Sequence, residues 1–217
     1  MTLIFRSFFS LSTLCGLIIM LTFSGCKVGD EDPAISFRSR NARLQANWKL
    51  MGMHNAVEIS SLDAAGAPVR TEIISDFDGS DLRVKTFING TQVSDSAFGF
   101  NYQMMIQQDG RVTYENTLIF SGLGSKSTGN DNWYWINSDH KKARVYLGSA
   151  LQFPATAGIA PLQANATLPI STLLTDFYVD GLRNKELKLS YHKSTAQTTL
   201  AGFQQISISS YFTFQSK

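Results

Sequence analysis

Residues 98–114, FGFNYQMMIQQDGRVTY, decide the fold class of this chain. Large apolar side chains alternate with polar ones before the pair Asp109-Gly110, and the alternation resumes beyond it. Successive side chains of a β-strand point to opposite faces of the sheet, and Asp-Gly favours a hairpin because glycine adopts the positive φ that such turns require. The stretch therefore predicts two antiparallel strands that share one apolar face. The apolar face of the first strand consists of Phe98, Phe100, Tyr102, Met104 and Ile106.

The same alternation recurs along most of the chain beyond residue 44. Turn pairs such as Asn89-Gly90 and Asp180-Gly181 separate the apolar runs, and no long amphipathic helix interrupts them. Residues 47–53 and 57–60 are expected to be separate strands, and residues 122–132 to be a loop. We therefore expect an all-β domain, an antiparallel up-and-down meander of about 8–10 strands that closes as a β-barrel, with a β-sandwich as the alternative.

The first 26 residues have a different character from the rest of the chain. An uncharged apolar run over residues 8–23 is shorter than the roughly 20 apolar residues that span a bilayer, and it ends in Phe23-Ser24-Gly25-Cys26. This ending resembles the lipobox of bacterial lipoproteins, although Phe23 stands where Leu is usual. The resemblance implies a signal peptide over residues 1–25 and acyl chains such as palmitate on Cys26. An uncleaved anchor or an ordinary secretory signal is the alternative.

Residues 26–43 are expected to form the lipidated N-terminus and a flexible tether that spans about 20 Å. Asp30-Glu31-Asp32 resembles the acidic export tag of Bacteroidetes surface lipoproteins, and a solvated linker is the alternative interpretation. Together, these two resemblances imply a lipid-anchored protein of the outer membrane of a Gram-negative bacterium. Exposure on the cell surface is favoured over a position facing the periplasm.

The domain over residues 44–217 resembles a known family. Residues 44–50, LQANWKL, are similar to the first strand of lipocalin-like domains, except that Ala46 stands where Gly is usual. Three further stretches resemble later strands of that family, namely residues 102–110, 129–135 and 177–189. The resemblance suggests a lipocalin-like lipoprotein of the Bacteroidetes kind and implies that Trp48 plugs the closed end of the barrel. It supplies no catalytic residue.

Composition excludes several classes of function. With 19 basic and 17 acidic residues, the chain lacks the positive charge that would neutralise a nucleic-acid backbone. Two cysteines and three scattered histidines do not form a metal-binding pattern, and the acidic residues 76–81 are expected to form a turn rather than a calcium site. No nucleophile with a neighbouring base is recognisable. We therefore expect no metal, no cofactor and no enzymatic activity.

Two further stretches have more than one interpretation. No charged residue occurs between Arg144 and Asp176, so this segment is expected to be a strap over one end of the barrel, with a ligand gate or a partner surface as alternatives. Asp95-Ser96-Ala97 resembles the O-glycosylation acceptor motif of Bacteroidetes, which makes Ser96 a candidate for modification.

The function is expected to depend on the interior of the barrel. A small barrel holds either its own side chains or one small apolar ligand. The first hypothesis is a membrane-anchored protein that binds a small hydrophobic or amphipathic molecule. The alternative is a structural or interaction component of a cell-envelope or surface complex, with a filled core and no ligand. The candidate ligand-binding residues are Phe98, Phe100, Tyr102, Met104, Trp133 and Trp135.

Overall fold

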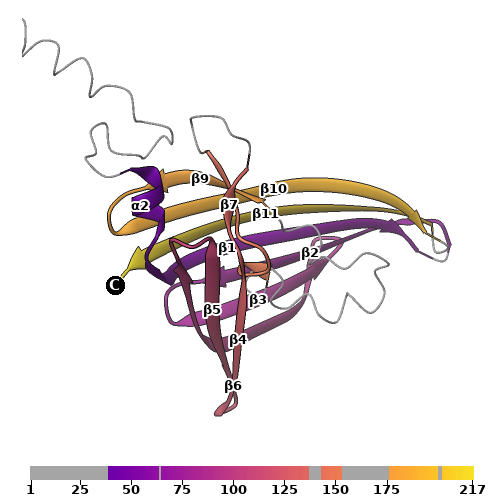
Figure 1. Ribbon diagram of the computed structural model, residues 1–217. Helices are drawn as coiled ribbons and strands as arrows, with labels where there is room; N and C mark the ends of the chain where they lie inside the picture. The colour runs from indigo at the N-terminus through magenta and orange to yellow at the C-terminus, as the bar shows by residue number, and fades with distance from the viewer. Residues whose placement is uncertain (1–38, 64, 137–142, 153–175, 200–201) are drawn as a thin grey trace, which may run out of the picture.

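The computed structural model describes residues 39–63, 65–136, 143–152, 176–199 and 202–217 (Figure 1). The expected signal peptide, Cys26, the start of the tether and most of the uncharged segment lie outside these residues. Within the described part of the chain, no helix has the length and the apolar character needed to cross a membrane.

Strands make up nearly all of the described structure, which confirms the prediction of an all-β antiparallel meander. One short helix, α2 (Arg40–Leu44), precedes them. The strands are β1 (Asn47–Leu62), β2 (Pro68–Phe77), β3 (Asp81–Ile88), β4 (Thr91–Ile106), β5 (Arg111–Phe120), β6 (Leu123–Asn132), β7 (Tyr134–Trp135), β8 (Arg144–Tyr146), β9 (Asp176–Leu182), β10 (Glu186–Thr199) and β11 (Gly202–Ser216).

These strands form one eleven-stranded sheet in the order β6-β5-β4-β3-β2-β1-β11-β10-β9-β8-β7. The first strand therefore lies in the middle of the sheet, between β2 and the last strand. The start of β1 also pairs with β4, with Trp48 opposite Met104, because β2 and β3 are too short to separate the two long strands there. The sheet is thus bent sharply at this point.

The two edge strands of the sheet are neighbours along the chain. Only Trp133 separates β6, at one edge, from β7, at the other. In a flat sheet of this order, ten spacings of about 4.8 Å would lie between those edges. Two peptide units span only about 7 Å. The end of β6 and the start of β7 therefore lie close together, which requires the sheet to curl strongly, and no ladder joins β6 to β7 among the described pairings.

Two expectations about the strands are wrong in detail. Residues 47–62 form one continuous strand, β1, rather than two, and its interruption in the sequence is the buried polar residue Asn55. Residues 123–132, expected to be a loop, form the edge strand β6. Every residue of β6 from Leu123 to Thr128 is exposed, so this strand shows no alternation between apolar and polar residues.

The concave side of the curled sheet holds the hydrophobic core. The alternating residues of β4 behave as predicted, since Phe100, Tyr102, Met104 and Ile106 are all buried there. Residues of β10 and β11 face them, and Phe214 lies against Tyr102. A few polar side chains also face this core, and one hydrogen bond joins Ser210 Oγ to Asn55 Oδ1 at 2.7 Å.

Candidate functional site

Three of the candidate ligand-binding residues, Phe100, Tyr102 and Met104, lie in the packed core. The ring of Tyr102 stacks at 6.5 Å between centroids on both Phe100 and Tyr114. Its hydroxyl donates a hydrogen bond to the backbone carbonyl of Ala150, and burial raises the pKa of Tyr102 well above its usual value. These side chains fill the interior at this level of the sheet.

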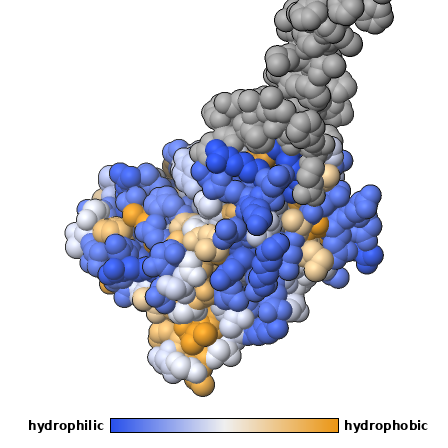
Figure 2. Space-filling view, turned by 90° about the vertical axis from the view of Figure 1, so that its left-hand side faces the viewer, coloured by the Kyte–Doolittle hydropathy of each residue, from blue (hydrophilic) through white to orange (hydrophobic). Residues whose placement is uncertain are grey.

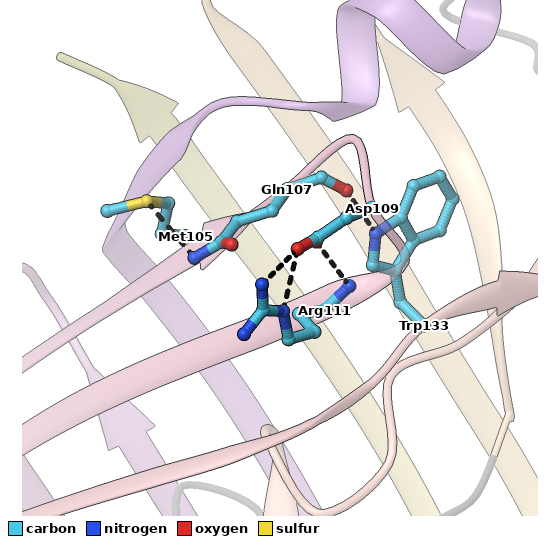
Figure 3. Close-up of polar contacts among 5 residues, drawn as sticks. All are labelled: Met105, Gln107, Asp109, Arg111 and Trp133. Carbon is cyan, nitrogen blue, oxygen red and sulfur yellow. Dashed lines mark hydrogen bonds and ion pairs between the residues drawn. The ribbon is translucent and has the colours of Figure 1, made fainter.

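Trp133 and Trp135, two further candidates, pack edge to face, with 6.3 Å between ring centroids, where β6 ends and β7 begins. Trp133 Nε1 donates a hydrogen bond of 2.7 Å to the Gln107 carbonyl (Figure 3). Trp135 Nε1 donates one of 2.6 Å to Asn41 Oδ1 in α2. Both indoles therefore tie distant parts of the chain together.

The β4–β5 turn holds the acceptor for Trp133 in place. As Figure 3 shows, Arg111 donates hydrogen bonds to the Asp109 carboxylate from Nε at 2.6 Å and from its backbone N–H at 3.1 Å. These bonds hold the pKa of Asp109 below its usual value. Gly110, with φ of +86°, completes the turn predicted from Asp-Gly, and its carbonyl accepts a hydrogen bond from the Trp133 backbone.

Trp48, the expected plug of the barrel end, is fully buried at the start of β1. Its Nε1 donates a hydrogen bond of 2.8 Å to the carbonyl of Leu44, the last residue of α2. The helix lies at one end of the strands (Figure 1), where Arg40 and Arg43 donate hydrogen bonds to the carbonyls of Val179 and Leu182. Helix α2 and Trp48 together cover this end, so the folded body includes residues assigned to the tether.

A polar cluster joins β6 to the turn that follows β8. The Asp131 carboxylate accepts hydrogen bonds from Ser149, from its N–H at 2.8 Å and its Oγ at 3.0 Å. Tyr114 adds a third contact, between its hydroxyl and Ser149 Oγ at 3.0 Å. Burial alone would raise the pKa of Asp131, but the hydrogen bonds from Ser149 and Asn132 outweigh it and lower the pKa. No local sequence pattern indicates this cluster, because its members are separated along the chain.

The sixth candidate residue, Phe98, lies where the interior face of the sheet becomes exposed. Its ring contacts that of Phe120 at 5.4 Å between centroids, and Phe120 pairs with Leu123 across the β5–β6 hairpin. Phe120 is 57% exposed and Leu123 is 80% exposed. We call Phe98, Leu118, Phe120 and Leu123 the apolar rim. Figure 2 shows hydrophobic surface gathered at the lower end of the molecule, where Figure 1 places this hairpin.

The apolar rim continues the aromatic interior. Leu118 pairs with Phe100, and all rim residues share the face of the sheet that carries Tyr102. A sequence pattern cannot distinguish Phe98 from Phe100, because both occupy the same face of one strand. Only the curl of the sheet buries Phe100 and leaves Phe98 half-buried.

The outer face of the sheet carries open polar grooves. One of about 790 Å³ lies at the β2–β3 turn and is lined by four aspartates, by Arg83 and by the apolar residues Met53 and Phe77. Arg83 Nε donates a hydrogen bond of 2.8 Å to Asp95. Asp78, also in this groove, accepts hydrogen bonds from the N–H groups of Ser80 and Asp81 and so stabilises the β2–β3 turn, as expected. Among the described residues, no three His, Cys, Asp or Glu side chains cluster in a way that could hold a metal ion.

The described histidines lie on β1 and β10, away from the apolar rim, whereas Ser96 lies two residues before Phe98 on the same face of β4. His54 Nδ1 contacts Asp76 Oδ1 at 2.7 Å, and His192 Nδ1 contacts Ser209 Oγ at 3.0 Å. Ser96, the candidate for O-glycosylation, is exposed on β4. These groups do not converge on one another.

Comparison with protein-family models and with curated proteins finds no match for this chain. The similarity to lipocalin-like lipoproteins therefore depends on the residues quoted from the sequence. The fold class stands independently on the sheet described above.

Proposed function

We propose that this chain is a membrane-anchored, lipocalin-like lipoprotein of the outer membrane that binds one small hydrophobic or amphipathic molecule. The observation that carries the proposal is the exposed apolar rim, which continues the aromatic interior of the curled sheet. The lipobox-like residues 23–26 support the anchor, with Cys26 as its attachment point, and residues 30–32 support display on the cell surface.

The proposal includes closure of the curled sheet as a barrel. Two observations support it: the single residue between β6 and β7, and the hydrogen bonds that bring Asp131 to Ser149. Closure along this line shields the free edge of β6, which would otherwise expose unpaired backbone groups.

The ligand is expected at the rim rather than deep inside. Tyr102 and its neighbours already occupy the interior, whereas the rings of Phe98 and Phe120 still face solvent in part. Covering such a surface stabilises a complex by about 25 cal/mol per Å² of apolar area. The rim residues carry no charge, so an acyl chain, a quinone or a similar apolar group fits their chemistry.

A ligand titration tests the proposal. Residues 27–217 are titrated with fatty acids, quinones and a hydrophobic dye, following intrinsic Trp fluorescence, dye emission and thermal stability. We expect saturable binding that Phe120→Ser weakens about tenfold or more, since one buried Phe contributes about 1.5–3 kcal/mol. Phe203→Ser is the matched control, because it changes an exposed Phe on a different strand, β11, and it should leave binding unchanged. Absence of saturable binding with every compound would contradict the proposal.

The anchor has its own test. In cells, Cys26→Ala should release the protein from membranes, and mass spectrometry of the unsubstituted protein should find acyl groups on Cys26. Protease or antibody access on intact cells tests surface display. Membrane partition that persists in Cys26→Ala would refute lipidation.

The burial of Tyr102, Phe100 and Met104 favours a second candidate function. A filled interior is what a structural or interaction component of a cell-envelope complex requires, since such a protein binds through its surface and needs no ligand. This candidate predicts no ligand-dependent thermal shift. It also predicts that Phe120→Ser reduces recovery of a cross-linked partner from intact cells, while Phe203→Ser does not.

A further inference from the structure

The tip of the β5–β6 hairpin is apolar on both of its faces. Phe120 and Leu123 point to the face that carries the core, whereas Ile119 points to the opposite face because neighbouring side chains of a strand alternate. All three are exposed, Ile119 by 46%. A protein partner docked on a sheet covers one face, whereas a lipid phase surrounds a tip from every side.

Charge is absent from this tip and reappears at its base. No charged residue occurs from Asn116 to Ser125. Next to this uncharged stretch, on the side of the body, Lys126 Nζ forms an ion pair with Glu115 Oε2 at 2.9 Å. This pair joins the two strands where the polar part of the hairpin begins. The charged pair therefore marks a boundary between a tip without charge and a polar body.

The length of the uncharged tip matches the depth of an interfacial insertion. Three register pairs lie beyond the charged pair, from Leu118 opposite Ser125 to Phe120 opposite Leu123, and then the turn. At about 3.3 Å per residue, the tip extends about 10 Å. Peripheral segments bury their apolar faces roughly 5–10 Å into the boundary between headgroups and acyl chains.

The turn at the tip is compact. Ser121 and Gly122 both have positive φ, of 49° and 79°, as in the tight two-residue turns that connect twisted strands. The hairpin projects from the body in Figure 1, and its hydrophobic surface ends the molecule in Figure 2. A narrow projection enters a lipid interface while displacing few headgroups.

We propose that the tip of the β5–β6 hairpin, through Ile119, Phe120 and Leu123, inserts into the interface of a lipid bilayer. This contact goes beyond ligand binding and beyond the lipid on Cys26. It does not require that either of those exists. It assigns the exposed apolar end of the hairpin to lipid, rather than to a second copy of the chain or to another protein.

The test measures the depth of the tip in the full chain. Leu123→Cys is labelled with an environment-sensitive nitrobenzoxadiazole probe, and the protein is reconstituted into vesicles of phosphatidylcholine and phosphatidylglycerol (3:1). Thr128→Cys is the matched control, because Thr128 is exposed on the same strand but lies on the polar side of Lys126. The unsubstituted chain, labelled in the same way, gives the background signal from Cys15 and Cys26.

We expect the probe at position 123 to shift its emission to the blue and to be quenched by acyl-chain nitroxide lipids. The probe at position 128 is expected to stay accessible to aqueous iodide. Adding Phe120→Ser should move the insertion equilibrium toward water by about tenfold or more. Circular dichroism of each variant checks that the sheet is retained.

Two results would overturn the proposal. One is a probe at position 123 that stays as accessible to iodide as the probe at position 128. The other is a blue shift that persists in detergent without vesicles and grows with protein concentration, which assigns the tip to a second copy of the chain. Neither depends on the ligand titration with residues 27–217, so this proposal and the proposed function can fail separately.

Discussion

At the scale of single residues, Gly148 is a position where a small change is expected to have a large effect on stability. Its φ is +54°, and a Cβ atom added there would lie 2.1 Å from Cγ of Asp131. A clash at that point also displaces the carboxylate that binds Ser149. Gly148 therefore allows both the turn after β8 and its attachment to β6.

Gly148→Ala is expected to lower the free energy of unfolding by about 3 kcal/mol, because left-handed strain of roughly 1 kcal/mol adds to the loss of the Asp131–Ser149 hydrogen bonds. Urea denaturation measures this. Gly90→Ala is the matched control, since Gly90 has φ of +80° and open space around it. That control isolates the backbone strain, and equal losses in the two variants would contradict the role given to Asp131.

At the scale of elements, the Asp78 carboxylate stabilises the β2–β3 turn by accepting several hydrogen bonds within it. Hydrogen bonds from the backbone N–H groups of Asp81 and Ser80, and from Ser80 Oγ, lower the pKa of Asp78 to about 2. A pKa depressed in the folded state means that this contribution is complete above the unfolded value of about 3.9 and is lost as the pH falls through the folded value.

We therefore expect an NMR titration of the Asp78 carboxylate to have its midpoint near pH 2. Ser80→Ala should raise that midpoint because it removes the hydroxyl donor but leaves both backbone donors in place. Asp78→Asn should also flatten the loss of stability between about pH 4 and pH 2. An Asp78 midpoint at the ordinary value for aspartate would show that the turn does not hold the carboxylate as described.

Helix α2 is short, but it contacts two strands that are distant in sequence, β7 and β9, as well as the start of β1. It touches β9 through Arg40 and Arg43, β7 through Asn41, and Trp48 through the Leu44 carbonyl.

A chain that begins at Gln45 should be about 3–5 kcal/mol less stable to urea than one that begins at Lys27, because it loses buried Leu44 and hydrogen bonds from charged donors. Ser39→Ala removes only the N-cap hydrogen bond of 3.1 Å from the Ala42 N–H to Ser39 Oγ, and it should lower the free energy of unfolding by about 1 kcal/mol. A truncation as mild as the cap variant would refute the role of α2 as an end cover.

The same scale shows how far sequence predicts the elements. The alternation in β4 is strong because one face of that strand is buried along half its length. β6 carries no such pattern, since an exposed edge strand does not need an apolar face. In β1 the buried Asn55 interrupts the alternation although the strand continues.

The candidate site is less predictable from sequence than the strands. The apolar rim depends on which part of a predicted face stays uncovered, and the Asp131–Ser149 contact joins segments that lie far apart in sequence. Neither is a local property.

At the scale of the whole molecule, curling of the sheet predicts a distance. If the sheet were flat, eight spacings of about 4.8 Å would separate β6 from β9, or roughly 38 Å. Spin labels at Thr128→Cys and Tyr178→Cys, both at exposed positions, should instead lie within about 25 Å of each other in a pulsed dipolar measurement, because Trp133 alone links the end of β6 to the start of β7. Gly148→Ala should broaden that distance distribution. A distance near the flat-sheet value would contradict the curl.

The position of β1 in the middle of the sheet has a consequence for the order in which the protein folds. β1 precedes the other described strands along the chain, yet one of its two long partners is β11, the last of them, and Trp48 lies opposite Ser216. Contacts between residues so far apart in sequence are slow to form, because the loop between them must first be closed. A chain still emerging from the ribosome therefore holds β1 paired on one side only, and this part of the sheet is completed only after β11 has been made.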